Sequence, residues 1–166
     1  MPERLGSGTL RLSGGPWVSG WASSVGKKET EGPLGGLFDQ CHTDDSLGQQ
    51  SWEMAESEMV CRAVERTLRA ANLSADAAQA MLGGDLNGQI IASSFAARTL
   101  GIPFLGLYGA CSTFIQALIL GASLVSGGYL DNALCAASSH YCTAERQFRF
   151  PVEMGNQRPP QASWTT

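Results

Sequence analysis

PFLGLYGACST, residues 103–113, is the stretch of sequence that decides the fold of this chain. Its first part, Pro103–Tyr108, is an apolar run that predicts a buried strand, and the small residues after it predict a tight turn. Ser112–Ser126 follows as a helix that is apolar nearly all round, so we expect it in the middle of the fold. Cys111 is therefore expected at the N-terminus of a buried helix, between two strands of a parallel sheet.

Strands and helices alternate on both sides of this stretch. Further strands are predicted at Ala80–Gly83 and Ala133–Ala137, and a second helix at Ile90–Leu100, which stops at Gly101. The clearest helix begins after the N-cap Ser51. Its apolar stripe is expected to contain Trp52, Ala55, Met59, Ala63, Val64, Leu68 and Ala71. This alternation is typical of an α/β layered fold with a parallel sheet.

The remaining segments are less regular. Residues 1–15 are rich in Gly and Ser and are expected to be flexible, while residues 16–166 are expected to form one domain. Within it, Pro16–Ala22 predicts a first strand and Ser23–Gln50 a long loop. From His140 onward the pattern is lost, which predicts an extended loop or a continuation that is cut short.

The composition excludes several classes of protein. Hydrophobic residues make up 43% of the 166 residues and charged residues 16%, which is not the composition of a disordered chain. A formal net charge of −4 excludes nucleic-acid binding driven by charge. Five cysteines without a CxxC pair favour an intracellular compartment. The longest apolar stretch, Phe114–Val125, is shorter than the ~20 residues of a spanning helix, so we expect a soluble protein that could reach a membrane through a partner.

Cys111 is the first candidate for chemistry. A helix N-terminus carries partial positive charge, which favours thiolate over thiol and lets backbone N–H groups meet a carboxylate or carbonyl. The alternative is that Cys111 only packs, because free cysteine is among the most buried residue types. For the other four cysteines, which lack this context, packing is the better interpretation.

Further polar residues follow the predicted strands. Asp85 comes after one strand, and Ser139 and His140 come after another. Because ligands gather at the carboxyl ends of parallel strands, we expect these residues to share one edge with Cys111. Each could also be structural, Asp85 as a turn residue and His140 as a loop histidine. The spacing of the cysteines around His140 does not favour a metal site.

The segment that follows contains Arg146, Arg149 and Arg158, whose guanidinium groups suit carboxylates, although ion pairs with nearby acidic residues are an equal alternative. The second histidine, His42, has no partner at a useful spacing and is expected to face solvent.

Several of these stretches resemble a known family. The turn GACST, residues 109–113, is similar to the nucleophile turn of the thiolase-like superfamily. Within that superfamily, the chain from about residue 17 onward resembles the stage V sporulation protein AD family. The matching stretches are SVGKKE (24–29), EGPLG (31–35), WEMAE (52–56), GDL (84–86), IPF (102–104), GACST (109–113), SSH (138–140) and AERQFR (144–149).

The resemblance implies a thiolase-like half-domain with a buried central helix, because family members are longer and have two similar halves. It also implies binding of dipicolinic acid (pyridine-2,6-dicarboxylate) for uptake into the developing spore, without catalysis, cofactor or metal. The expected partners are other proteins of the spore dipicolinate-transport complex, in the forespore or spore. The residues expected to bind the ligand are Asp85, Cys111, Ser112, Ser139, His140 and Arg149.

Two other hypotheses stay open. The chain could be an acyltransferase with Cys111 as nucleophile, in which case His140 is the histidine available as its base. Alternatively, it could be a fragment that acts through a separate second half or as a homodimer. An all-round apolar helix at 112–126 favours the fragment hypothesis, because such a helix needs cover on both sides.

Overall fold

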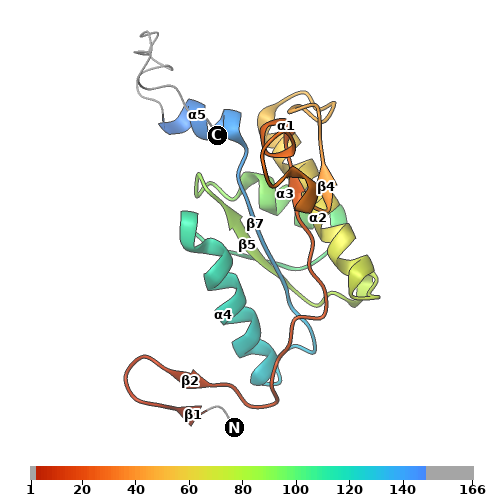
Figure 1. Cartoon of the computed structure of the whole chain (residues 1–166). Helices are drawn as coiled ribbons and strands as arrows, with labels where there is room; N and C mark the ends of the chain where they lie inside the picture. Colours follow the sequence, from red (N-terminus) through yellow and green to blue (C-terminus); the bar gives the residue numbers. More distant parts are fainter. Residues whose placement is uncertain (1–2, 149–166) are drawn as a thin grey trace.

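The centre of the molecule is a parallel sheet with helices on both faces (Figure 1), in a computed structural model that describes residues 3–148. The sheet has three strands in the order β6-β5-β7. Their bounds are Met81–Asp85 for β5, Phe104–Gly106 for β6 and Leu134–Ser138 for β7. Met81 of the central strand pairs with Phe104 on one side and Leu134 on the other. The expected α/β layered fold with a parallel sheet is confirmed.

Side chains on successive strand residues point to opposite faces, and this separates the core into two layers. Met81 and Leu134 pack with α2 (Trp52–Ala70) and α3 (Ile91–Leu100) on one face. Leu82 packs with α4 (Thr113–Ser126) on the other face. The same alternation determines on which face of the sheet each polar residue at a strand end lies.

Local signals in the sequence set the helix ends correctly. The Ser51 hydroxyl accepts a hydrogen bond from the Met54 N–H at 3.2 Å, so it is the N-cap of α2. After α2, Asn72 adopts φ +55°, and the Leu73 N–H reaches back to the Leu68 carbonyl at 2.9 Å. Gly101 ends α3 at φ +71°. The buried residues of α2 are Ala55, Glu56, Val60, Cys61, Val64 and Leu68, which only partly match the expected stripe.

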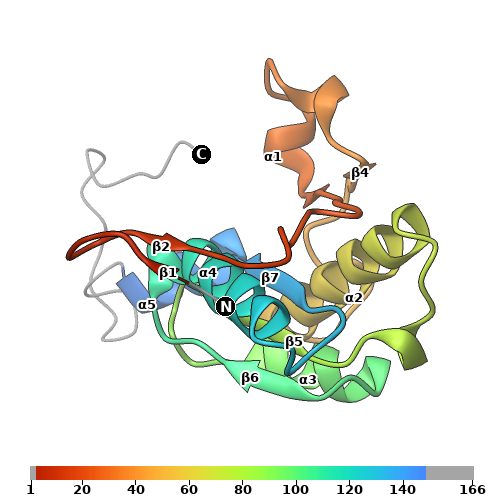
Figure 2. The ribbon, with the colours of Figure 1, turned by 90° about the horizontal axis from the view of Figure 1, so that it is seen from below.

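A second group of elements stands apart from the central sheet, as Figure 2 shows for α1 and β4. It consists of β3 (Ser24–Val25), α1 (Lys27–Thr30), the 3-10 turn η1 (Gly35–Leu37) and β4 (Gln40–Cys41). The two strands pair in parallel. Part of the expected long loop therefore has regular secondary structure. Polar contacts also hold this segment: the Asp39 carboxylate accepts from the Ser23 N–H at 2.8 Å.

The N-terminal residues form a hairpin of β1 (Glu3–Arg4) and β2 (Leu10–Arg11), beneath α4 in Figure 1. The hydroxyl of Ser126, at the end of α4, donates to the Ser13 carbonyl at 2.7 Å. The expected flexibility of residues 1–15 stays a prediction.

Three expectations about local structure are wrong. Pro16–Ala22 forms no strand, because it pairs with no strand among the described residues, and Trp17 is 85% exposed. The expected buried strand at 103–108 is the short edge strand β6, whose Leu105 is 48% exposed. After His140 we expected an extended loop or a continuation that is cut short; the chain forms the helix α5 (Tyr141–Phe148), so the extended loop is wrong for residues 141–148.

The expectation that the 112–126 helix is enclosed on all sides is also not met. Thr113 and Ala117 of α4 are fully buried against the sheet. The opposite side of the helix is open among the described residues, with Ile115 and Ile119 more than half exposed. One sheet face can cover only one side of a helix, and nothing in residues 3–148 covers the other.

Candidate functional site

Cys111 lies where the sequence places it, at the N-terminal end of the 113–126 helix. It belongs to the 3-10 turn η3 (Ala110–Ser112), directly before α4, and both Cys111 and Ser112 are exposed. The Ser112 hydroxyl donates to the Gly109 carbonyl at 2.9 Å and accepts from the Gln116 amide at 3.1 Å. The prediction of a cysteine at the helix N-terminus is confirmed. The Cys111 thiol is exposed to solvent, next to the N-terminus of α4.

Asp85 is the last residue of β5, not a residue of the loop after it, and its side chain is 4% exposed. One carboxylate oxygen, Oδ1, accepts from the Gln89 N–H at 3.2 Å. The other, Oδ2, is buried without a hydrogen-bond partner among the described residues. The register puts Asp85 opposite Ser138 of β7. Both residues are an even number of positions from Met81 and Leu134, which places them on the face of α2.

His140 is buried and both nitrogens of its ring are engaged. Nε2 lies 2.7 Å from the Asp45 carbonyl and donates to it, while Nδ1 accepts from the Cys142 N–H at 3.2 Å. The ring also stacks on Trp52, with centroids 5.3 Å apart. This pattern defines a neutral imidazole that caps the start of α5. A ring used in this way has no free nitrogen to serve as a base for Cys111.

Glu56 is the residue of this region that the sequence reasoning missed. It lies on α2, is 4% exposed, and its Oε1 accepts from the Ser138 hydroxyl at 2.7 Å. Burial is the main reason why the pKa of Glu56 is raised, and the neighbouring Asp85 adds to it. The hydrogen bonds from Ser138 and Thr143 and the nearby His140 oppose this rise. A signal was present in the sequence: Glu56 begins a row of i+4 steps whose other members, Val60, Val64 and Leu68, are all buried.

A pocket of about 340 Å³ opens next to His140, between α1, the 44–48 loop and the start of α5. Its charged lining residues are Lys27, Lys28, Glu29 and Asp45. Lys28 places its Nζ 4.6 Å from the centroid of the Tyr141 ring. The rest of the lining is Gly26, Leu47, Met59, Ser139, His140, Cys142 and Ala144. These residues provide two ammonium groups, an aromatic face and an apolar wall in a volume typical of small-molecule sites.

The loop that forms one wall of this pocket is held by a single acidic residue. The Asp44 carboxylate accepts from the Gly48 N–H at 3.0 Å and from the Ser46 N–H at 3.0 Å. Hydrogen bonds from Ser46, and then from Gly48, lower the pKa of Asp44. The loop therefore presents Asp45 and Leu47 to the pocket in a defined position.

Only some of the residues predicted to bind the ligand line this pocket. Ser139 and His140 line the pocket, whereas Asp85 and Cys111 are not among its lining residues. Arg149 and Arg158 lie outside the described residues, and of Arg146 only the backbone in α5 is described. The predicted roles of these residues in binding stay predictions. Among residues 3–148, no group of three His, Cys, Asp or Glu side chains is arranged to hold a metal ion.

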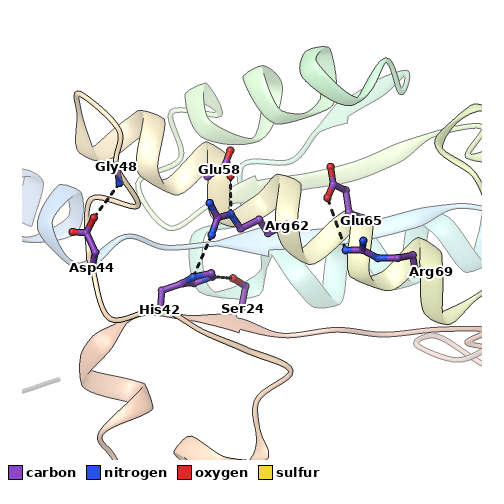
Figure 3. A network of polar contacts seen from close by, with 8 residues as sticks. All are labelled: Ser24, His42, Asp44, Gly48, Glu58, Arg62, Glu65 and Arg69. Carbon is purple, nitrogen blue, oxygen red and sulfur yellow. Dashed lines mark hydrogen bonds and ion pairs between the residues drawn. The ribbon is translucent and has the colours of Figure 1, made fainter.

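His42 corrects the expectation of a solvent-facing histidine (Figure 3). It is half-buried, and its Nδ1 accepts from the Arg62 guanidinium at 3.5 Å. Arg62 in turn forms an ion pair with Glu58 at 2.7 Å. Because the arginine can only donate, the His42 proton is on Nε2, which donates to the Ser24 hydroxyl at 3.0 Å. This histidine therefore does not activate Ser24 as a nucleophile.

The fold and the pocket define an α/β layered protein with a ligand-sized site at the carboxyl end of its parallel sheet. Comparison with known proteins narrows this class. The family model for Stage V sporulation protein AD (SpoVAD) matches residues 6–166. The chain is also 44% identical, over 149 residues, to Stage V sporulation protein AD of Bacillus subtilis (strain 168). The chain belongs to the stage V sporulation protein AD family.

This similarity covers 90% of the chain and 44% of the Bacillus protein, so the chain spans less than half of that relative's length. Two solved structures are also similar in part. A 3-oxoacyl-[acyl-carrier-protein] synthase III from Aquifex aeolicus VF5 is 26% identical, with a TM-score of 0.49 over 53% of this chain and 30% of that one. A variant of OleA from Xanthomonas campestris is 16% identical, with a TM-score of 0.45 over 68% of this chain and 40% of that one.

Proposed function

We propose that this chain binds dipicolinic acid, pyridine-2,6-dicarboxylate, during spore formation and does not transform it. The observation that carries the proposal is the pocket between α1 and α5. The only two lysines of the 166-residue sequence, Lys27 and Lys28, both line it. A dicarboxylate needs two cationic or strongly donating partners, and Lys27 and Lys28 are the two cationic residues of this lining.

The aromatic part of the ligand also has a counterpart. Lys28 lies over the ring of Tyr141, so this part of the pocket carries a cation and an aromatic face together. Leu47, Met59 and Ala144 provide apolar contact for a pyridine ring. The acidic lining residues Glu29 and Asp45 repel anions. An anion without an aromatic ring lacks the apolar contact that would offset this repulsion, so these residues disfavour it.

The geometry of His140 supports binding over acyl transfer. An acyltransferase needs a base within hydrogen-bond reach of its nucleophile. His140 donates to the Asp45 carbonyl and accepts from the Cys142 N–H, so both of its nitrogens hold backbone groups. A histidine in this role shapes the pocket wall and is not available as a base for Cys111.

The proposal extends to location and partners. Membership of a sporulation family is consistent with action in the forespore or spore, together with other proteins of the dipicolinate-transport complex. No helix within residues 3–148 is long and apolar enough to cross a membrane. Attachment to the spore membrane would therefore rest, for this part of the chain, on contacts with such partners.

Calorimetric titration with pyridine-2,6-dicarboxylate tests the proposal. We expect Lys28→Gln to weaken binding by about tenfold or more, as for loss of one charged hydrogen bond. Arg98→Gln, which removes an exposed cation on α3, is the matched control and should bind like the wild type. Cys111→Ala should also bind normally, because Cys111 does not line the pocket. No binding by the wild type contradicts the function, and full affinity in Lys27→Gln and Lys28→Gln contradicts the site.

A further inference from the structure

Glu56 connects α2 to both ends of the turn that forms one wall of the pocket. Its Oε1 accepts from the Ser138 hydroxyl at 2.7 Å, and its Oε2 lies 3.3 Å from the Thr143 hydroxyl. Ser139 and His140, which line the pocket, lie between these two contacts. The two partners are separated in the sequence by 82 and 87 residues from Glu56. The carboxyl group of Glu56 is therefore a junction between two layers of the fold.

The hydrogen bonds that Glu56 and Thr143 can make depend on how many hydrogen atoms their oxygens carry. The Thr143 hydroxyl lies 2.8 Å from the His140 carbonyl, closer than to Glu56. A hydroxyl has one hydrogen and can donate to only one of these two acceptors. If Glu56 carries a proton on Oε2, that O–H donates to Thr143, which then donates to His140. With this proton, all of the groups are satisfied in one continuous chain of hydrogen bonds.

The surroundings of Glu56 favour the protonated form. Asp85 of β5 is the carboxyl group that faces it and raises the pKa of Glu56, while His140 is the nearby group that lowers it. From β7 and α5 the facing groups are the hydroxyls of Ser138 and Thr143. Within residues 3–148, none of the ion pairs involves Glu56. Burial is the largest of these influences, and it raises the pKa of the Glu56 carboxyl.

We propose that Glu56 is a positioning residue whose proton holds the pocket wall in place. With the proton, Glu56 bridges Ser138 and Thr143 and fixes the Ser139-His140 turn. Without it, the bridge to Thr143 opens and the carboxylate faces Asp85, so the start of α5 loosens from α2. The consequence for the ligand rests on the proposed function: affinity for a dicarboxylate should fall as pH rises. The movement of the turn itself does not depend on that function.

Trp52 offers an internal probe, because it stacks on His140. We would follow its fluorescence from about pH 5 to pH 8.5 in a chain with Trp17→Phe, Trp21→Phe and Trp164→Phe. The expected result is one transition, with a midpoint above the ordinary glutamate value of 4.5. Glu56→Gln should remove the transition, because its amide can accept from Ser138 and donate to Thr143 at every pH. Glu58→Gln, on the same helix, is the matched control and should keep it.

The absence of a transition in the parent chain, or its persistence in Glu56→Gln, would overturn the proposal. A second arm measures affinity for pyridine-2,6-dicarboxylate above about pH 6, where both of its carboxylates are ionised. The parent should lose about tenfold in affinity towards high pH, and Glu56→Gln should show no such loss. If the probe never binds while the Trp52 transition is present, only the proposed function fails. If the probe binds with the same pH profile in both proteins, the proposal for Glu56 fails.

Discussion

At the scale of single residues, the polar contacts of this chain are used mainly to hold segments together. His42 is one example: it connects Ser24 of β3 to Arg62 of α2, and Arg62 is anchored to Glu58 (Figure 3). Burial lowers the pKa of His42, and the positive charge of Arg62 lowers it further. The neutral ring is the form that fits, because a proton on Nδ1 would face the guanidinium group.

This arrangement predicts a loss of stability in mild acid. The folded protein keeps His42 neutral below the ordinary value of 6.5, whereas the unfolded chain protonates it there. The unfolded state therefore binds more protons, and the free energy of unfolding should fall as pH decreases from 6.5. Urea unfolding of the wild type and His42→Gln measures this. We expect a smaller slope between about pH 6.5 and pH 5 in the variant. Equal slopes would show that other groups cause the loss.

At the scale of elements, the contact between β5 and α4 depends on the absence of a side chain. A Cβ on Gly84 would overlap the Leu107 carbonyl oxygen and lie 3.3 Å from Thr113 Cγ2, at the first residue of α4. Glycine therefore allows the helix and the 107–112 segment, which carries Cys111, to lie directly against the end of the central strand. The position of the cysteine turn follows from this close approach.

We therefore predict that Gly84→Ala destabilises the protein by about 1–3 kcal/mol, the usual cost of overpacking a core. Gly36→Ala is the matched control, because a Cβ there has open space around it within 4 Å. It should be neutral or slightly stabilising, since alanine restricts the unfolded chain. Thermal or urea unfolding of both variants checks the prediction. Wild-type stability in Gly84→Ala would mean that α4 can move away from the strand without cost.

At the scale of the whole molecule, the described part of the chain leaves one side of α4 uncovered. The exposed apolar side chains there are Phe114, Ile115, Ile119 and Leu120, each 44–58% exposed. Full burial of one such side chain is worth about 1.5–3 kcal/mol. A contiguous face of this kind is typical of an interaction surface, and the chain spans less than half the length of its Bacillus relative.

We predict that the isolated 166-residue chain covers this face by self-association, in the simplest case as a two-fold dimer. Light scattering coupled to size exclusion should give a mass above 17.5 kDa. Ile119→Glu should shift the mass towards the monomer, because a carboxylate would be buried in the contact. Ile91→Glu, which changes an exposed isoleucine on α3, should not. A monodisperse wild-type monomer of 17.5 kDa would contradict the prediction.

The sequence by itself determined the alternation of strands and helices in the central part of the chain and several of the helix ends. The N-cap Ser51, the stop at Gly101 and the apolar runs around Cys111 were all readable, because caps and periodicity depend on contacts between near neighbours. Strands alternating with helices also indicated the parallel sheet. The predicted strand at Pro16–Ala22 does not form, because a strand needs a partner strand and the local sequence does not specify one.

Only the tertiary structure decided which polar residues meet. Asp85 is the last residue of β5 and lies on the α2 face, whereas Cys111 comes directly before α4 on the other face, and His140 follows β7. The row of i+4 steps in α2 indicates that Glu56 is buried, but only packing brings it to Ser138. The pocket joins Lys28 to Tyr141 across more than a hundred residues of chain. Such meetings depend on register and on burial across layers, and no local pattern encodes them.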